Sequence, residues 1–166
     1  VIFVALLATF AALLIEWRDR KGIGILQGSV GGLVLLLISW AFLDSGIDNK
    51  AVLQAVLNSN FWLGTHVVVI TAGYAFCILC ALYAHYCLYV SRHTSPLLFG
   101  LALAALLLTA TGTLLGGVWA DQSWGRFWGW DPKENGALLI VLWLIWIIHG
   151  RLSGHIRGAF FSAGLA

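Results

Sequence analysis

The stretch Leu97–Val118 reads LLFGLALAALLLTATGTLLGGV and carries no formal charge from end to end. The hydrocarbon core of a bilayer is about 30 Å thick, and about 20 mostly apolar residues are needed to cross it as an α-helix. Apolar and polar residues do not alternate in this stretch, so the pattern favours a helix over a strand. The stretch therefore predicts a transmembrane α-helix, and with it an all-α fold.

The composition of the whole chain agrees with this prediction. The 166 residues are 61% hydrophobic and only 10% charged, with a mean hydropathy of +0.94. A soluble domain has about 25% charged residues, so this chain lacks the polar side chains to cover a soluble enzyme. Disordered chains need low hydrophobicity, and a net charge of +2 is too small to indicate nucleic-acid binding. With these three classes excluded, the composition indicates an integral membrane protein.

The formal charges cluster, and the gaps between the clusters predict five membrane spans and the start of a sixth. Backbone groups inside lipid must be paired within the segment, which favours helices. We expect a polytopic transmembrane helical bundle that forms one integral membrane domain over residues 1–166. Because both ends of the sequence lie in apolar runs, we also expect a fragment of a longer chain. The predicted spans are Val1–Ile15, Gly22–Leu43, Gly64–Tyr89, Leu97–Val118, Pro132–Arg151 and Gly158 onward.

The distribution of Lys and Arg predicts the orientation, since these residues are enriched in cytoplasmic loops. Six of them follow the first, third and fifth spans, and three follow the second and fourth. We therefore expect the loops at Asp44–Asn60 and Trp119–Glu134 to face outward. For a bacterial plasma membrane, that is the periplasmic side.

The most informative stretch is Trp119–Asn135, WADQSWGRFWGWDPKEN, which holds four of the nine tryptophans. Asp131 is a good N-cap, Pro132 suits the first helical position, and Glu134 completes a capping-box-like pair. A helix is therefore predicted to begin here, with its anion-favouring end toward the loop.

Two interpretations of these aromatic residues are possible. Tryptophan is common at membrane interfaces, which predicts an aromatic belt. Four Trp and one Phe around two glycines favour instead a platform for a large, flat, partly anionic ligand such as haem. The glycines would let the backbone bend and let the ligand approach. Arg126, Lys133 or the helix N-terminus would then meet the haem propionates.

The stretch at residues 124–135, WGRFWGWDPKEN, resembles the tryptophan-rich WWD motif of haem-handling membrane proteins of cytochrome c maturation. The GGVWA before it and the apolar helix after it are most similar to the CcsA/ResC type, which is related to CcmC and CcmF. Asn135 is similar to the CcmF type, so the motif alone leaves the subfamily open. The resemblance spans about Gly116–Arg151 and, more weakly, Thr65–Tyr74.

This resemblance implies two haem sites. Topology places His66 level with the tryptophan loop, and imidazole is a haem axial ligand; the family implies that His66 binds the iron of an outer haem. His149 lies about 26 Å along the helix from Pro132, where the family implies an inner haem ligand. Haem b is the expected cofactor. The predicted haem-binding residues are His66, His149, Trp119, Trp124, Arg126, Phe127, Trp128, Trp130 and Asp131.

For most of the remaining histidines and cysteines, no role in haem binding is expected. His93 and His155 lie in basic loops and should be solvated, whereas His85 is a packed histidine or a second ligand at the inner site. The family's two other histidines have no counterpart here, so missing sequence or another chain would have to supply the partners. The C-x-x-C of Cys77 and Cys80 lacks the following His of a haem-attachment motif, and packing in the helix is expected for both thiols.

The predicted function is to bind haem and present it outside the membrane for covalent attachment to apocytochrome c, as part of a haem lyase (holocytochrome c synthase) complex. The substrate would supply the two thiols of its C-x-x-C-H motif, and the resemblance implies a CcsB/ResB-type membrane partner. Three alternatives stay open: a haem-delivery subunit without ligation, a di-haem b-type electron-transfer subunit, and a transporter with an aromatic gate. The last would show broken helices or inverted repeats, which are not evident.

Overall fold

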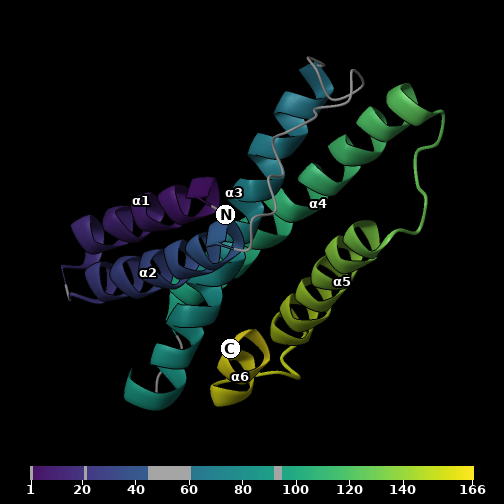
Figure 1. Cartoon of the computed structure of the whole chain (residues 1–166). Helices are drawn as coiled ribbons and strands as arrows, with labels where there is room; N and C mark the ends of the chain where they lie inside the picture. The colour runs from purple at the N-terminus through teal and green to yellow at the C-terminus, as the bar shows by residue number, and fades with distance from the viewer. Residues whose placement is uncertain (1, 21, 45–60, 92–94) are drawn as a thin grey trace.

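The computed structural model describes residues 2–20, 22–44, 61–91 and 95–166, and these residues form an all-α protein (Figure 1). Four of its helices are long and apolar enough to cross a membrane, and a shorter apolar helix precedes them. The prediction of a polytopic helical membrane protein is therefore confirmed. The helices are α1 (Ile2–Asp19), α2 (Ile23–Asp44), α3 (Phe61–Tyr86), α4 (Pro96–Trp124), α5 (Pro132–Leu152) and α6 (Ala159–Leu165), with a π-helical turn at Cys87–Ser91.

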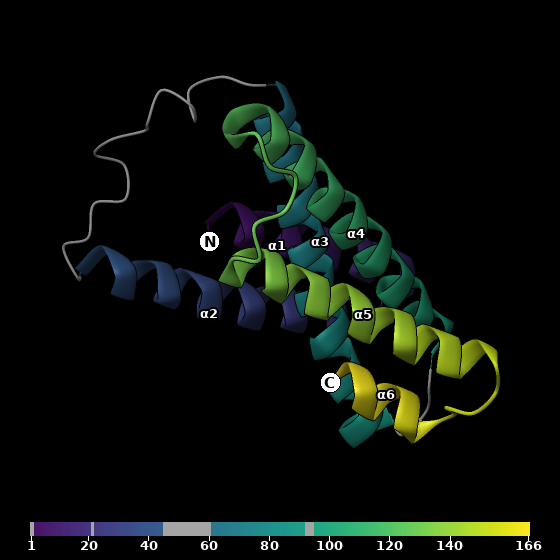
Figure 2. The same cartoon turned by 90° about the vertical axis from the view of Figure 1, so that its right-hand side faces the viewer.

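The antiparallel helices α3 and α4 form the central pair, and they run side by side in both views (Figures 1 and 2). Their backbones approach closely because glycines face the partner helix. A Cβ on Gly73 would lie 2.7 Å from the Thr109 hydroxyl, and one on Gly112 would lie 2.7 Å from Cα of Ile70. Small residues allow this approach in membrane helices, where packing replaces the hydrophobic drive. Thr109 and Gly112 therefore lie in the contact between the two helices.

Helices α1 and α2 form a second antiparallel pair, which lies against α3 (Figure 1). The pair is also held by close backbone approach, since a Cβ on Gly28 would lie 3.1 Å from Cβ of Ala12. The Glu16 carboxylate accepts the backbone N–H groups of Gly22 and Gly24 at 2.8 and 3.1 Å. One side chain of α1 thus satisfies donors at the start of α2, which stabilises the tight connection.

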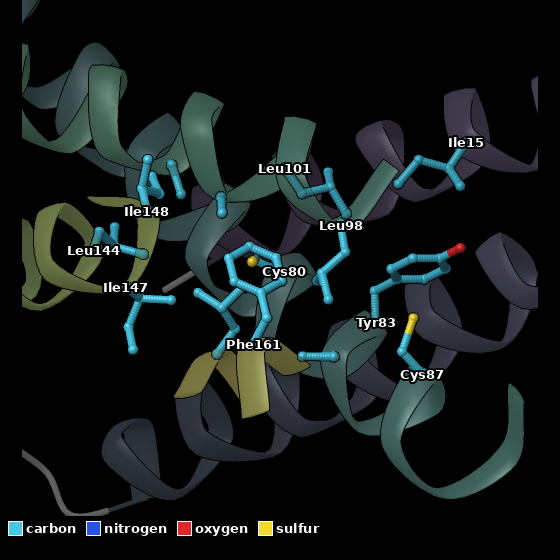
Figure 3. Close-up of a cluster of buried hydrophobic side chains, with 14 residues drawn as sticks. Ile15, Cys80, Tyr83, Cys87, Leu98, Leu101, Leu144, Ile147, Ile148 and Phe161 are labelled. Atoms are coloured by element: carbon cyan, nitrogen blue, oxygen red, sulfur yellow. The ribbon is translucent and has the colours of Figure 1, made fainter. Parts of the chain in front are cut away.

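An apolar core joins α3, α4, α5 and α6 at the end remote from the tryptophan loop (Figure 3). Phe161 of α6 is 1% exposed and belongs to the same cluster as Cys80 of α3 and Ile147 of α5. Cys77, Cys80 and Cys87 are free thiols, the last two buried. The expected packing role of Cys77 and Cys80 agrees with this placement.

Several helix boundaries differ from the predicted spans, and α1, for example, continues to Asp19 instead of ending at Ile15. α3 begins at Phe61, three residues before the predicted Gly64, and α4 continues to Trp124 instead of ending at Val118. Gly125 ends α4 because it adopts the left-handed conformation, with φ of 69°, and its N–H bonds to the Asp121 carbonyl at 2.8 Å. The first third of the predicted loop at 119–135 is therefore helical. Most of the other predicted outer loop, Asp44–Asn60, lies outside the described residues.

Candidate functional site

The start of α3 and the end of α4 lie together at one end of the molecule. His66 lies in the second turn of α3, and the described chain from Gly125 to Asp131 runs from the end of α4 back along the molecule to α5, which begins farther from that end (Figures 1 and 2). The topology-based expectation that His66 and the loop share one level agrees with this arrangement.

His66 is half-buried against the backbone of α4. Its Nδ1 lies 2.7 Å from the Gly112 carbonyl oxygen. A carbonyl only accepts hydrogen bonds, so Nδ1 must carry the hydrogen and donate it. In the neutral ring, Nε2 then holds the free lone pair. Histidines that bind metals almost always fix their other ring nitrogen in this way.

Phe127 folds back from the loop onto α4. A Cβ on Gly117 would lie 2.5 Å from Cζ of Phe127, so the ring rests directly on the helix backbone. One residue earlier, a Cβ on Gly116 would lie 2.7 Å from Cε1 of His66. Two adjacent glycines of α4 therefore support a ring from α3 and a ring from the loop.

The four tryptophans of this region form two edge-to-face pairs. Trp119 and Trp124 have ring centroids 4.6 Å apart, and Trp128 and Trp130 have centroids 6.0 Å apart. Such geometry is favoured by the aromatic quadrupole. Within the pairs, Trp119 is 9% exposed, whereas Trp130 is 70% exposed. The structure thus assigns the four rings different environments, with Trp119 in the scaffold and Trp130 on the surface.

Two indole N–H groups lack a hydrogen-bond partner among the described residues. Nε1 of Trp119 and Nε1 of Trp128 are both buried and unpaired. A buried unpaired donor costs about 1–3 kcal/mol relative to a paired one. Unpaired donors are uncommon in native proteins, and here they lie in the loop region where an acceptor from a ligand is expected.

The start of α5 has the predicted cap. Asp131 Oδ1 accepts the N–H groups of Lys133 and Glu134 at 2.8 and 2.9 Å, while Glu134 Oε2 accepts those of Asp131 and Gly129 at 3.3 and 2.7 Å. The backbone N–H of Glu134 lowers the pKa of Asp131, with further lowering from Lys133 and Arg126 and an opposing rise from burial. The capping-box prediction is confirmed, and Glu134 also ties the loop to the helix.

Trp130 has an unusual backbone conformation. Its φ is 58°, in the left-handed region that bulky residues rarely adopt. The Asn135 side chain donates to the Trp130 carbonyl at 3.0 Å, and this bond helps to hold the turn. Strained residues of this kind cluster at functional sites because the surrounding structure over-determines them.

Arg126 lies at the edge of the aromatic group. Its guanidinium carbon is 5.8 Å from the centroid of the Trp124 ring, a cation–π contact. The guanidinium also fills the space that a side chain on Gly129 would occupy. Gly129 therefore makes room for Arg126, whereas the predicted bend of the backbone comes from Gly125. Arg126 and Lys133 are both exposed and leave positive charge at the loop surface.

The histidines at the other end are less constrained. His149 is exposed in the last turn of α5 and makes no side-chain hydrogen bond to the described residues. His85 is exposed and bonds back to the Ala81 carbonyl at 2.8 Å, and His155 bonds to the Ser153 hydroxyl at 2.9 Å. His93 lies outside the described residues. No interaction joins His149 to His85 in the described part of the chain.

Haem fits the loop end better than an isolated metal ion does. The described residues contain no group of three or more His, Cys, Asp or Glu side chains that could hold a metal ion. A porphyrin brings its own nitrogen ligands and needs only axial ones, which the free Nε2 of His66 can supply. Exposed rings at Trp124, Phe127 and Trp130 offer apolar surface, and Arg126 offers a partner for a carboxylate.

Sequence reasoning missed three features of this site. Nothing in the sequence marks Gly116 and Gly117 as the supports of the His66 and Phe127 rings. The burial of Trp119 also had no local signal. Gly125 was a recognisable helix-ending glycine, and it could have placed the end of α4 correctly.

The cytochrome c assembly protein family model matches residues 1–163 of this chain. Protein NrfI of Wolinella succinogenes is 36% identical over 149 residues, which cover 80% of this chain and 16% of that protein. The cytochrome c biogenesis protein CcsA of Chlamydomonas reinhardtii is 35% identical over 130 residues, or 67% of this chain and 35% of that protein. The chain thus spans about a sixth to a third of the length of these relatives.

Proposed function

Because the chain belongs to the cytochrome c assembly protein family, we propose that it binds haem at the tryptophan loop and presents it for covalent attachment to apocytochrome c. The relatives named CcsA are described as cytochrome c biogenesis proteins, and that role is carried to this chain as part of the proposal. The protein containing it would act as a component of a holocytochrome c synthase.

One observation carries the proposal. His66 donates through Nδ1 to the Gly112 carbonyl, so in the neutral ring the Nε2 lone pair stays available, and Nε2 has no hydrogen-bond partner among the described residues. The same helix carries the Phe127 ring of the loop on the next residue, since a Cβ on Gly116 would meet His66 and one on Gly117 would meet Phe127. Iron ligation at Nε2, with porphyrin faces covered by loop rings, uses both features.

The other residues of this end would bind and orient the porphyrin. Trp124, Phe127 and Trp130 would cover apolar faces or edges, while Arg126 would pair with a propionate. The buried N–H groups of Trp119 and Trp128 would gain acceptors. Haem supplies the two vinyl groups to which the thiols of the substrate's C-x-x-C-H motif add. The chain's own contribution is positioning, which lowers the entropic part of the barrier.

The proposal also includes the side of the membrane on which the loop lies, the route of haem through the protein, and a partner protein. The charge distribution supports a loop on the outer side of the membrane, the periplasmic side in a bacterium. Haem would enter near His149 and reach the His66 level. The family resemblance supports a CcsB/ResB-type membrane protein as the partner, and relatives several times longer than this chain leave room for further haem ligands.

A pyridine haemochrome spectrum of the purified full protein tests haem binding. We expect non-covalent haem b that is lost in His66→Ala. Co-expression with an apocytochrome c carrying C-x-x-C-H should yield haem-stained holocytochrome, and His66→Ala should abolish it. A protein that holds no haem would contradict the proposal. Bound haem without any holocytochrome would favour the haem-delivery alternative.

A further inference from the structure

Two neighbouring glycines of α4 are occupied by rings from different parts of the chain. A Cβ on Gly116 would lie 2.7, 2.9 and 3.3 Å from Cε1, Nδ1 and Nε2 of His66. A Cβ on Gly117 would lie 2.5 to 2.7 Å from three ring atoms of Phe127. Side-chain carbons essentially never approach so closely, so both positions require glycine if the rings are to stay in place.

Glycine in a helix interior lowers helix stability, and the ring contacts give a reason why glycine stands at these two positions. It is clearly less favourable than alanine in a helix interior. Gly100, in the same helix, has open space around its Cβ position and serves as a matched reference. At Gly116 and Gly117 the space is filled by aromatic rings instead of by a partner helix backbone.

The hydrogen bond to Gly112 adds a directional element to this contact. The Gly112 carbonyl lies one helical turn before Gly116 and receives Nδ1 of His66 at 2.7 Å. Contact with Gly116 limits the tilt of the imidazole, and the bond to Gly112 fixes which nitrogen is protonated. Together they leave only Nε2 available, in one direction.

Resting on the haem-binding function proposed above, we propose that Gly116 and Gly117, with the Gly112 carbonyl, are positioning residues that align the iron-binding imidazole of His66 with the Phe127 ring of the loop. Adjacent residues of one helix turn carry both rings, so the distance between the iron ligand and the aromatic platform is set by α4. Gly116 acts through His66, and Gly117 acts through Phe127.

Alanine substitutions at the two glycines should therefore impair haem binding in different ways. In Gly116→Ala the methyl group displaces the imidazole, so iron loses its ligand while the loop remains. In Gly117→Ala the methyl group displaces Phe127, so the platform shifts while the imidazole remains. Loss of a supporting interaction of a metal ligand typically weakens metal binding by about ten- to a hundredfold.

The experiment is hemin titration of the full protein in detergent, with absorption spectra, for wild type, Gly116→Ala, Gly117→Ala, His66→Ala and the control Gly100→Ala. We expect Gly116→Ala to bind hemin about ten- to a hundredfold more weakly and to give the spectrum of His66→Ala. Added imidazole should restore the wild-type spectrum in both. Gly117→Ala should bind weakly with the wild-type ligand spectrum and no response to imidazole. Gly100→Ala should match wild type.

A melting curve and a double variant separate positioning from folding. Removing the imidazole removes the clash, so His66→Ala/Gly116→Ala should melt and bind hemin as His66→Ala does. A folded Gly116→Ala with wild-type affinity and spectrum would overturn the inference, and so would hemin loss that imidazole does not restore. If His66→Ala itself leaves the spectrum unchanged, the proposed function fails as well; if only the Gly116 result fails, that function stands.

Discussion

The two ends of the α3–α4 pair differ in how their side chains pack. At the end that includes α6, interlocked apolar side chains such as Phe161, Leu98 and Cys80 fill the space between the helices (Figure 3). At the tryptophan-loop end, rings rest on glycine backbone, two indole N–H groups have no partner among the described residues, and Trp130 has a left-handed backbone. The α6 end has the features of a stable core, and the tryptophan-loop end has the features of a binding site.

The histidines follow the same division. His66 is half-buried and bonded through Nδ1 to the Gly112 carbonyl, whereas His149 is exposed and has no such bond among the described residues. The chain by itself therefore pre-organises one candidate iron ligand and leaves the other free. An inner haem site at His149 would need a surface from beyond the described residues to fix its imidazole.

Trp119→Ala should give the largest loss of stability. The variant would show whether Trp119 supports the fold or belongs to the surface proposed to bind haem. Trp119 is 9% exposed and packs edge-on against Trp124, and truncating a buried aromatic costs about 3–5 kcal/mol. Thermal unfolding in detergent, followed by circular dichroism, measures the loss. An unchanged unfolding midpoint would mean that Trp119 belongs to the platform and not to the scaffold.

Trp130→Ala should have the opposite effect, with little change in stability and a loss of haem binding. The side chain is 70% exposed, so its removal leaves no cavity. A large ring against a porphyrin is worth roughly 1.5–3 kcal/mol, which predicts a hemin affinity about ten- to a hundredfold lower. Hemin titration beside a melting curve checks both parts. Normal hemin affinity in this variant would make Trp130 an interfacial anchor.

Asp131→Ala should cost about 1 kcal/mol, the usual value of a lost N-cap. The pKa of Asp131 is lowered in the fold, so its stabilising effect is complete above the unfolded value of about 3.9 and is lost as the pH falls through the lower folded value. Unfolding midpoints of the variant and wild type should differ equally at pH 7 and pH 5 and converge below about pH 4. A difference that disappears between pH 7 and pH 5 would contradict this cap.

His155→Ala should have the smallest effect. His155 is exposed and bonds only to the Ser153 hydroxyl among the described residues, and surface substitutions usually change stability by about 0.5 kcal/mol or less. Hemin affinity and unfolding midpoint should both match wild type. A clear loss of haem here would extend the binding region to the loop after α5 and weaken the contrast between the two ends.

The parts of the fold with local signals were predictable from the sequence. The start of α5 followed from Asp131 and Pro132, and its capping box is present in the structure. The span at Leu97–Val118 was found from its apolar length, but α4 runs on to Trp124 because polar residues after the span can continue a helix outside the hydrocarbon. Only Gly125 stops it, through a backbone conformation that hydropathy does not detect.

The parts of the site that depend on helix register were not predictable. Residue spacing places His66 at the level of the loop, but its bond to Gly112 depends on how α3 lies against α4. The different exposure of Trp119 and Trp130 was also not predictable, because the sequence pattern does not distinguish the two residues. The residue pattern thus placed the proposed site at the tryptophan-loop end, whereas the different environments of its residues depend on how the helices pack.

The most direct test of the central claim compares His66→Ala with His149→Ala in the full protein. Purified proteins would be depleted of haem, given hemin directly in detergent, and examined by absorption spectroscopy with and without imidazole. We expect His149→Ala to regain the loop-site spectrum from added hemin alone, whereas His66→Ala should regain it only with imidazole. A His66→Ala protein that recovers the wild-type spectrum without imidazole would contradict the claim that this end of the chain holds haem through His66.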